Sequence, residues 1–77
     1  MKRLLKIFSK VMGIKEVLIT EETSKEDTPA WDSFNSLMLV SEIESAFNIK
    51  FSIQEAVSIK SVKDIKNILE KHGIILI

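Results

Sequence analysis

The sequence predicts a small all-α domain: a four-helix bundle with a long loop between helices one and two and a short third helix. Apolar residues recur at three- and four-residue spacings in separate segments, as expected of amphipathic helices. Glycine follows two of these segments, and a capping-box pattern opens two of them. Because 77 residues leave room for only one compact core, we expect residues 1–77 to form a single domain.

The first helix is expected to start near the N-terminus and to end near Gly13, because glycine is favoured just past a helix end. Lysines at positions 6 and 10 interrupt the opening residues, and no long apolar core or small-residue cleavage site follows. We therefore expect a helix here and not a signal peptide. Its inward face should contain Leu4, Phe8, Val11 and Met12, with Leu5 and Ile7 beside them.

A polar segment over residues 14–30 should form a long connecting loop. Its turn-forming residues are Thr20, Thr23, Ser24, Thr28 and Pro29. Within the loop, Val17, Leu18 and Ile19 are expected to return to the core. Trp31 should then pack the end of the loop against the bundle, because a large aromatic side chain gains most from burial.

The second helix is expected to run from about Ser33 to Phe47. Proline disfavours helix for the residue before it, so the preceding Pro29 marks the loop side of this boundary. An apolar stripe at helical spacing should face the core and comprises Phe34, Leu37, Val40 and Phe47, with Ile43 beside it.

The third and fourth helices are both predicted from capping boxes. Ser52-Ile53-Gln54-Glu55 opens the third, and Ser61-Val62-Lys63-Asp64 opens the fourth, which should end at Gly73 with His72 in its last turn. The inward residues of the fourth helix are expected to be Val62, Ile65, Ile68 and Leu69. The apolar tail Ile74-Ile75-Leu76-Ile77 is too short to span a bilayer and should fold back on the bundle.

Composition argues against several classes of function. With 11 basic and 11 acidic residues the net charge is zero, so the chain has no electrostatic footprint for nucleic acid, and binding to nucleic acid is disfavoured. The chain has no cysteine, so disulfides, cysteine metal sites and cysteine nucleophiles are excluded. No nucleophile–base pair, metal-ligand cluster or phosphate-binding glycine loop is present in the sequence, so we do not expect an enzyme. We expect a cytoplasmic monomer without stable membrane insertion.

Asp32-Ser33-Phe34 lies where the loop gives way to the second helix. The first turn of a helix offers unpaired N–H groups and a partial positive charge, so a phosphate ester on Ser33 would be stabilised there. The same residues also fit an ordinary helix cap. Asp32 could cap the helix itself, or orient the hydroxyl and approach the metal of an incoming enzyme; capping is the simpler interpretation.

Asp32-Ser33-Phe34, together with Phe47-Asn48-Ile49-Lys50-Phe51 beginning fourteen positions after the serine, resembles the acyl carrier protein family, including peptidyl and D-alanyl carriers. The resemblance spans nearly the whole chain. In that family an Asp-Ser-Leu motif opens the second helix, and its serine carries 4′-phosphopantetheine. Here Phe34 replaces the usual leucine. The competing Ser36 fails the fourteen-residue count, so the resemblance points to Ser33.

The resemblance implies a carrier that catalyses nothing itself. A Mg²⁺-dependent phosphopantetheinyl transferase would attach the arm to Ser33, with Asp32 in support, and the arm's thiol would hold acyl or aminoacyl groups as thioesters. The further implied partners are an acyl- or aminoacyl-loading ligase and acyl-accepting enzymes of fatty acid, polyketide or nonribosomal peptide biosynthesis. The alternative is an unmodified, carrier-like helical interaction module in which Ser33 is only a cap.

In the resembling family, partner enzymes dock on the exposed face of the second helix, largely through acidic side chains. The matching positions here are Phe34, Asn35, Leu37, Met38, Ser41, Glu44 and Ser45, joined by Ile59 near the third helix. Apart from Glu44 and the nearby Glu42, this face lacks acid, so we expect weak electrostatic steering. Leu37 has a simpler interpretation as a core residue.

Overall fold

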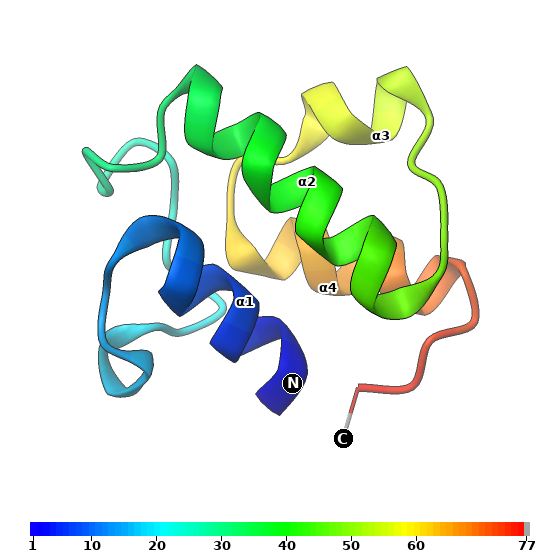
Figure 1. Cartoon of the computed structure of the whole chain (residues 1–77), viewed down its shortest axis with the longest axis horizontal. Helices are drawn as coiled ribbons and strands as arrows, with labels where there is room; N and C mark the ends of the chain where they lie inside the picture. The colour runs from blue at the N-terminus through cyan, green and yellow to red at the C-terminus, as the bar shows by residue number, and fades with distance from the viewer. Residues whose placement is uncertain (77) are drawn as a thin grey trace.

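The computed structural model describes residues 1–76. Its helices are α1 (Lys2–Met12), α2 (Ser33–Phe47), α3 (Ile53–Ser58) and α4 (Val62–Lys71), and a 3₁₀ turn, η1 (Glu16–Leu18), lies in the long loop. Figure 1 shows α1 and α3 on either side of α2, with α4 behind it. Across the described residues no strand forms, so the predicted all-α fold with a long first loop and a short third helix is confirmed.

The first helix buries one face and ends where its glycine predicts. Leu4, Phe8 and Met12 are buried at four-residue spacing, so one stripe of α1 supplies a wall of the core. Gly13 has φ 69° and donates its N–H to the Ser9 carbonyl oxygen at 2.8 Å. This left-handed conformation suits glycine, which has no Cβ to clash with the backbone.

The loop after α1 differs from the sequence prediction at two residues. Val17 is 85% exposed and Leu18 is 67% exposed, whereas Ile19 alone of the three enters the core. The cause is η1, in which Leu18 and Ile19 donate to the carbonyl oxygens of Lys15 and Glu16. Three residues per turn send successive side chains in different directions, so a single such turn cannot bury three neighbours on one side.

The end of the loop is fixed before α2 begins. Trp31 is buried, and its ring meets Phe8 edge-on with centroids 5.0 Å apart, as expected for an anchor. Further back, the Val62 N–H donates to Thr23 at 2.9 Å and the Lys25 N–H donates to Lys60 at 2.8 Å. The loop is therefore bonded to the start of α4, which holds the entry to α2 in place.

The second helix has the predicted bounds but presents a different face to the core. Leu39 and Ile43 are its buried residues, whereas Phe34 is 70% exposed and Leu37 is 73% exposed. The predicted stripe is thus wrong for Phe34 and Leu37, and the interpretation of Leu37 as core is wrong. Both faces of this helix carry apolar residues, so periodicity alone does not identify the buried one.

Both predicted capping boxes form. Ser52 accepts the Glu55 N–H at 3.0 Å and Ser61 accepts the Asp64 N–H at 3.3 Å. In return, the Ser52 and Ser61 backbone N–H groups donate to the carboxylates of Glu55 and Asp64. The four residues predicted to face inward from α4 are all buried, whereas α3 has no buried residue.

The C-terminal tail folds back only in part. The last helical residue is Lys71, and Gly73 follows with φ 84°. In the tail, Ile74 and Leu76 pack against the core while Ile75 is exposed; Ile77 lies outside the described residues.

Candidate functional site

Asp32 caps α2 and Ser33 is its first helical residue. The Asp32 backbone is extended, and its carboxylate accepts the Asn35 N–H at 2.9 Å. This is the geometry of a helix N-cap, so the capping role expected for Asp32 is confirmed. Ser33 itself does not cap, so the interpretation of Ser33 as the helix cap is wrong.

The Ser33 side chain faces solvent at the start of a 15-residue helix. Among the described residues, no hydrogen bond involves its hydroxyl. The uncapped N–H groups of the first turn and the helix dipole both favour negative charge at this end. An ester of phosphoric acid on Ser33 would therefore be both accessible and electrostatically tolerated.

Asn35 anchors the first turn of α2 to the loop. Its side-chain amide donates to the Ala30 carbonyl oxygen at 2.7 Å, and the Asp32 N–H donates to the same oxygen at 3.0 Å. Asn35 is only partly exposed. The side-chain amide nitrogen of Asn35 is thus engaged within the protein. Only the exposed part of this side chain is available for the docking role expected of Asn35.

Ser36, one turn later, has the opposite environment to Ser33. Its hydroxyl oxygen is buried and finds no hydrogen-bond partner within residues 1–76. A buried hydroxyl without a partner is uncommon, because it loses water without a compensating bond. The Ser36 oxygen is also shielded from any enzyme approaching in solution, unlike the Ser33 oxygen.

A groove of about 270 Å³ lies next to Ser33, between α2 and α3. Figure 1 shows α3 returning alongside α2 to form this side of the molecule. We call it the α2–α3 groove; its lining residues are Lys25, Ser33, Ser36, Leu37, Val40, Ala56 and Val57. Its wall is mainly apolar, with the two serines and one lysine as its polar members.

The outer face of α2 carries most of the expected docking residues. Its exposed members are Phe34, Leu37, Met38, Ser41 and Ser45. The nearby acids are engaged elsewhere: Glu44 accepts the Phe51 N–H at 2.8 Å, and Glu42 pairs with Lys10 at 3.5 Å. The face is therefore mainly apolar and hydroxyl-bearing, and Glu44 keeps its charge because the Phe51 N–H that it accepts is neutral.

Ile59 does not belong to the exposed surface. It is 4% exposed and lies in the core cluster, so its expected place among the docking residues is wrong. Ile59 is the C-cap of α3 and has an extended backbone. The short connection from α3 to α4 lets this side chain enter the core, which the sequence pattern around it does not indicate.

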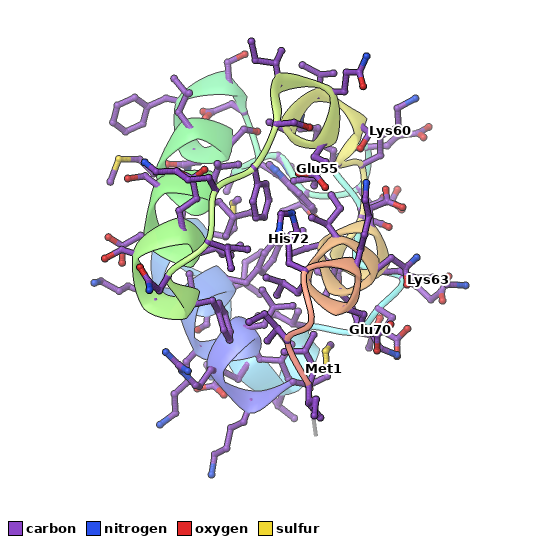
Figure 2. All side chains as sticks on the ribbon, turned by 90° about the vertical axis from the view of Figure 1, so that its right-hand side faces the viewer. Met1, Glu55, Lys60, Lys63, Glu70 and His72 are labelled. Atoms are coloured by element: carbon purple, nitrogen blue, oxygen red, sulfur yellow. The ribbon has the colours of Figure 1, made fainter. Side chains whose placement is uncertain are left out.

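A cluster around Glu55 joins α3 to the end of α4, and sequence analysis did not find it. The Glu55 carboxylate accepts from the Ser52 N–H at 2.9 Å, lies 3.1 Å from His72 Nε2 and pairs with Lys71 at 3.2 Å. Figure 2 shows Glu55 and His72 pointing toward each other. The Ser52 N–H foremost, with His72 and Lys71, lowers the pKa of Glu55 to about 2.

The Glu55 cluster ties down α3, which buries no residue of its own. The Phe51 ring stacks on His72 with centroids 6.3 Å apart and an interplanar angle of 14°. The sequence indicates only part of this cluster, since the capping box identifies Ser52 and Glu55 but no residue of the C-terminal region. His72, the partner at the end of α4, is seventeen residues from Glu55, and no local sequence pattern links these two residues.

The described residues hold no group of three or more histidine, cysteine or acidic side chains that could bind a metal ion. Over the same residues, no helix is both long and apolar enough to cross a membrane. The site therefore consists of an exposed serine at a helix start beside a groove. In a small helical bundle, these features fit a carrier-type domain.

Comparison with known proteins supports this class. No family model matches the chain. The chain is 31% identical over 70 residues to a protein named acyl carrier protein from Syntrophobacter fumaroxidans (strain DSM 10017 / MPOB), covering 91% of this chain and 86% of that protein. It is also 31% identical over 71 residues to an acyl carrier protein from Buchnera aphidicola subsp. Baizongia pistaciae (strain Bp), covering 92% and 91%.

This chain belongs to the acyl carrier protein family. Members of that family are carriers and not catalysts, so the chain is not an enzyme.

Proposed function

We propose that this protein carries acyl or aminoacyl groups as thioesters on a 4′-phosphopantetheine arm attached to Ser33. The observation that carries the proposal is the exposed Ser33 hydroxyl at the start of α2, which is free because Asp32 takes the capping role. The α2–α3 groove beside it supports the proposal, because it offers the arm an apolar wall. The two relatives named acyl carrier protein support it independently.

Ser33 is a better attachment residue than Ser36 on accessibility alone. A transferase must bring the phosphorus of coenzyme A to the serine oxygen, and the Ser36 oxygen is buried. At Ser33, the oxygen would bond to that phosphorus as the pyrophosphate bond breaks. Adenosine 3′,5′-bisphosphate would leave, and the hydroxyl proton would pass to a base of the transferase or to water. The transferase would supply the Mg²⁺.

The arm would give the chain a thiol, which the polypeptide lacks because it contains no cysteine. The chain's own residues would hold and present the arm. Asp32 fixes the first turn of α2 through its cap, and Asn35 ties that turn to the loop. The attachment oxygen is thus presented on a rigid helix start, which reduces the cost of ordering it for a partner.

We propose the outer face of α2 as the docking surface for the transferase, the loading ligase and the acyl-accepting enzymes. Of the residues expected there, Phe34, Leu37, Met38, Ser41 and Ser45 fit this role because they are exposed, and Asn35 and Glu44 are partly available. Single exposed apolar residues are ordinary, but several on one face are typical of binding sites. The chain would act as one domain over residues 1–77 and as a monomer.

The test is intact mass after incubation with coenzyme A, Mg²⁺ and a broad-specificity phosphopantetheinyl transferase. The wild type and Ser36→Ala should each gain one arm, and Ser33→Ala should gain none. Circular dichroism of each variant checks that it is folded.

A gain in Ser33→Ala would move the attachment site. If folded wild type gains no mass with several transferases, the proposal is wrong and the unmodified interaction module becomes the better account. In that case the exposed apolar face of α2 would bind a partner without an arm.

A further inference from the structure

The exposed side of α1 is entirely basic. The exposed residues of this helix are Lys2, Arg3, Lys6 and Lys10. At 3.6 residues per turn, these four positions fall within an arc of about 100° on the side opposite the buried stripe of the helix. We call this surface the basic face of α1. The zero net charge of the chain therefore conceals a local concentration of positive charge.

Most of this charge is not neutralised within the protein. Over residues 1–76, neither Lys2 nor Lys6 forms an ion pair. Lys10 lies 3.5 Å from the Glu42 carboxylate, but its side chain is 76% exposed, so water screens this pair. The basic face therefore presents positive charge to whatever approaches it.

Arg3 keeps its charge and shows where the basic face lies in the molecule. Its guanidinium group lies over the Phe47 ring, 4.6 Å from the centroid, and donates to the Ala46 carbonyl oxygen. Both contacts are to neutral groups. Phe47 ends α2 and Ser33 begins it, so the two residues are separated by roughly 21 Å along the helix axis. The start of the basic face is thus at the opposite end of α2 from Ser33.

Two of these cations oppose the helix that carries them. The start of a helix has a partial positive charge, which favours acidic residues in the first turn. In α1 the first turn has no acidic residue and no side-chain cap, and it contains Lys2 and Arg3 instead. Departures from local folding preferences are expected mainly at functional sites, so the arrangement indicates an anionic ligand.

An apolar segment lies beside the start of the basic face. A groove of about 520 Å³ is lined by Lys2 and Arg3 and also by Ile74, Ile75 and Leu76 of the C-terminal tail. Figure 1 shows this tail turning back toward the start of α1. Because Ile75 is 80% exposed, a large apolar side chain is available next to the cations.

We infer that the basic face of α1 and the adjacent Ile75 bind the surface of an anionic lipid bilayer. Lipid phosphate groups supply the complementary negative charge, and the headgroup region accepts an exposed apolar side chain beside them. Three of the four cations are lysines, which are depleted at protein–protein interfaces, so a lipid surface is favoured over an acidic protein. The binding is peripheral, since the apolar stripe of α1 stays in the core.

The experiment measures partition of the full chain into sedimenting lipid vesicles. One set is phosphatidylcholine alone, and the other contains equal parts of phosphatidylcholine and anionic phosphatidylglycerol, both at about 0.1 M salt, where charges act over about 10 Å. The test variant is Lys2→Gln/Lys6→Gln, and the control Lys60→Gln/Lys63→Gln removes the same charge elsewhere. Figure 2 shows Lys60 and Lys63 pointing outward beside α3 and α4, away from α1.

A second pair of variants tests the apolar contact. Ile75→Ser removes the exposed side chain of the tail. The matched control is Ile53→Ser, because Ile53 is the same residue type and is 84% exposed, but lies on α3. Circular dichroism checks that every variant is folded.

Wild type should bind the anionic vesicles and not the neutral ones. Lys2→Gln/Lys6→Gln should weaken this partition by about 25-fold, because each basic residue near an anionic surface contributes about fivefold. Its control should stay within about twofold of wild type, because its cations lie beyond the range of screened charges. Ile75→Ser should weaken partition by about threefold or more, whereas Ile53→Ser should not.

Equal losses in the two double lysine variants would mean that net charge alone drives adsorption, and would overturn the inference. Equal partition into both kinds of vesicle, or into neither, would do the same. If the chain binds polyglutamate or duplex DNA but not anionic vesicles, the basic face recognises an acidic macromolecule and the inference is wrong. Ser33→Ala should bind vesicles as wild type does, so failure of arm attachment would refute the proposed function alone.

Discussion

At the residue scale, Asp32 and Ser33 have separate roles although they are adjacent. Asp32→Ala should lower the free energy of unfolding by about 1 kcal/mol, because it leaves the Asn35 N–H without its acceptor. Asp32→Asn keeps an oxygen acceptor and should cost only a fraction of that. Urea denaturation of the two variants and the wild type measures the difference. Equal losses in both would show that the charge, and not the hydrogen bond, stabilises this helix start.

Glu55 should make stability depend on pH in acid. The Ser52 N–H, His72 and Lys71 lower its pKa in the folded chain from 4.5 to about 2, so the unfolded chain binds this proton first as pH falls. The stabilisation is therefore complete above pH 4.5 and is lost as pH falls toward about 2. The variant Glu55→Gln keeps a capping-box side chain but does not titrate.

The measurement for Glu55 is the difference in unfolding free energy between wild type and Glu55→Gln across that range. We expect wild type to be the more stable above pH 4.5, with the gap closing toward about pH 2. A gap that stays constant with pH would contradict a lowered pKa for Glu55.

At the element scale, α3 and α4 both begin with a capping box, but loss of the box should affect the free energy of unfolding differently in the two helices. Ser61→Ala should lower the free energy of unfolding by about 1 kcal/mol, because α4 is part of the core and unfolds with it. Ser52→Ala should change global stability less, because α3 buries no residue and can open locally. Hydrogen exchange should show faster exchange of α3 amides in Ser52→Ala, with α4 protection unchanged. Faster exchange in α4 would mean that the two helices open together.

The helix bounds were predictable because their signals are local. Gly13 ends α1 and the boxes at Ser52 and Ser61 open α3 and α4 through contacts within a few residues. The buried face of α2 was not predictable in the same way. Leu37 and Leu39 are the same residue type two positions apart, and only the packing of the other helices determines which one is buried.

At the scale of the whole molecule, the candidate site combines segments that no local pattern joins. The sequence predicted the positions of Asp32 and Ser33 because the motif coincides with the start of α2. It did not predict that Lys25 lines the same groove as Ser33, because that position depends on the backbone contacts of residues 24–25 with residues 60–61. Ile59 was misplaced for a related reason: a residue between two helices takes its burial from how those helices pack.

The charge balance of the chain leads to a prediction about recognition. The chain has equal numbers of acidic and basic residues, and the acids near the outer face of α2 are engaged by Lys10 and the Phe51 N–H. Electrostatically steered association falls steeply with ionic strength, whereas apolar contacts do not. The kcat/KM of the transferase for this chain should therefore change by less than about twofold between roughly 50 and 500 mM salt.

If apolar contact replaces charge in this way, Leu37 should matter more than any acid on the same face. Leu37→Ala should lower kcat/KM by about tenfold at both salt concentrations, because a central exposed anchor contributes on the order of 1.4 kcal/mol. Val17→Ala is the matched control, since Val17 is also an exposed apolar residue, 85% exposed against 73% for Leu37, but lies in η1 beside α1. A steep loss of rate with salt in wild type, or equal losses in the two variants, would show that docking does not depend on this face.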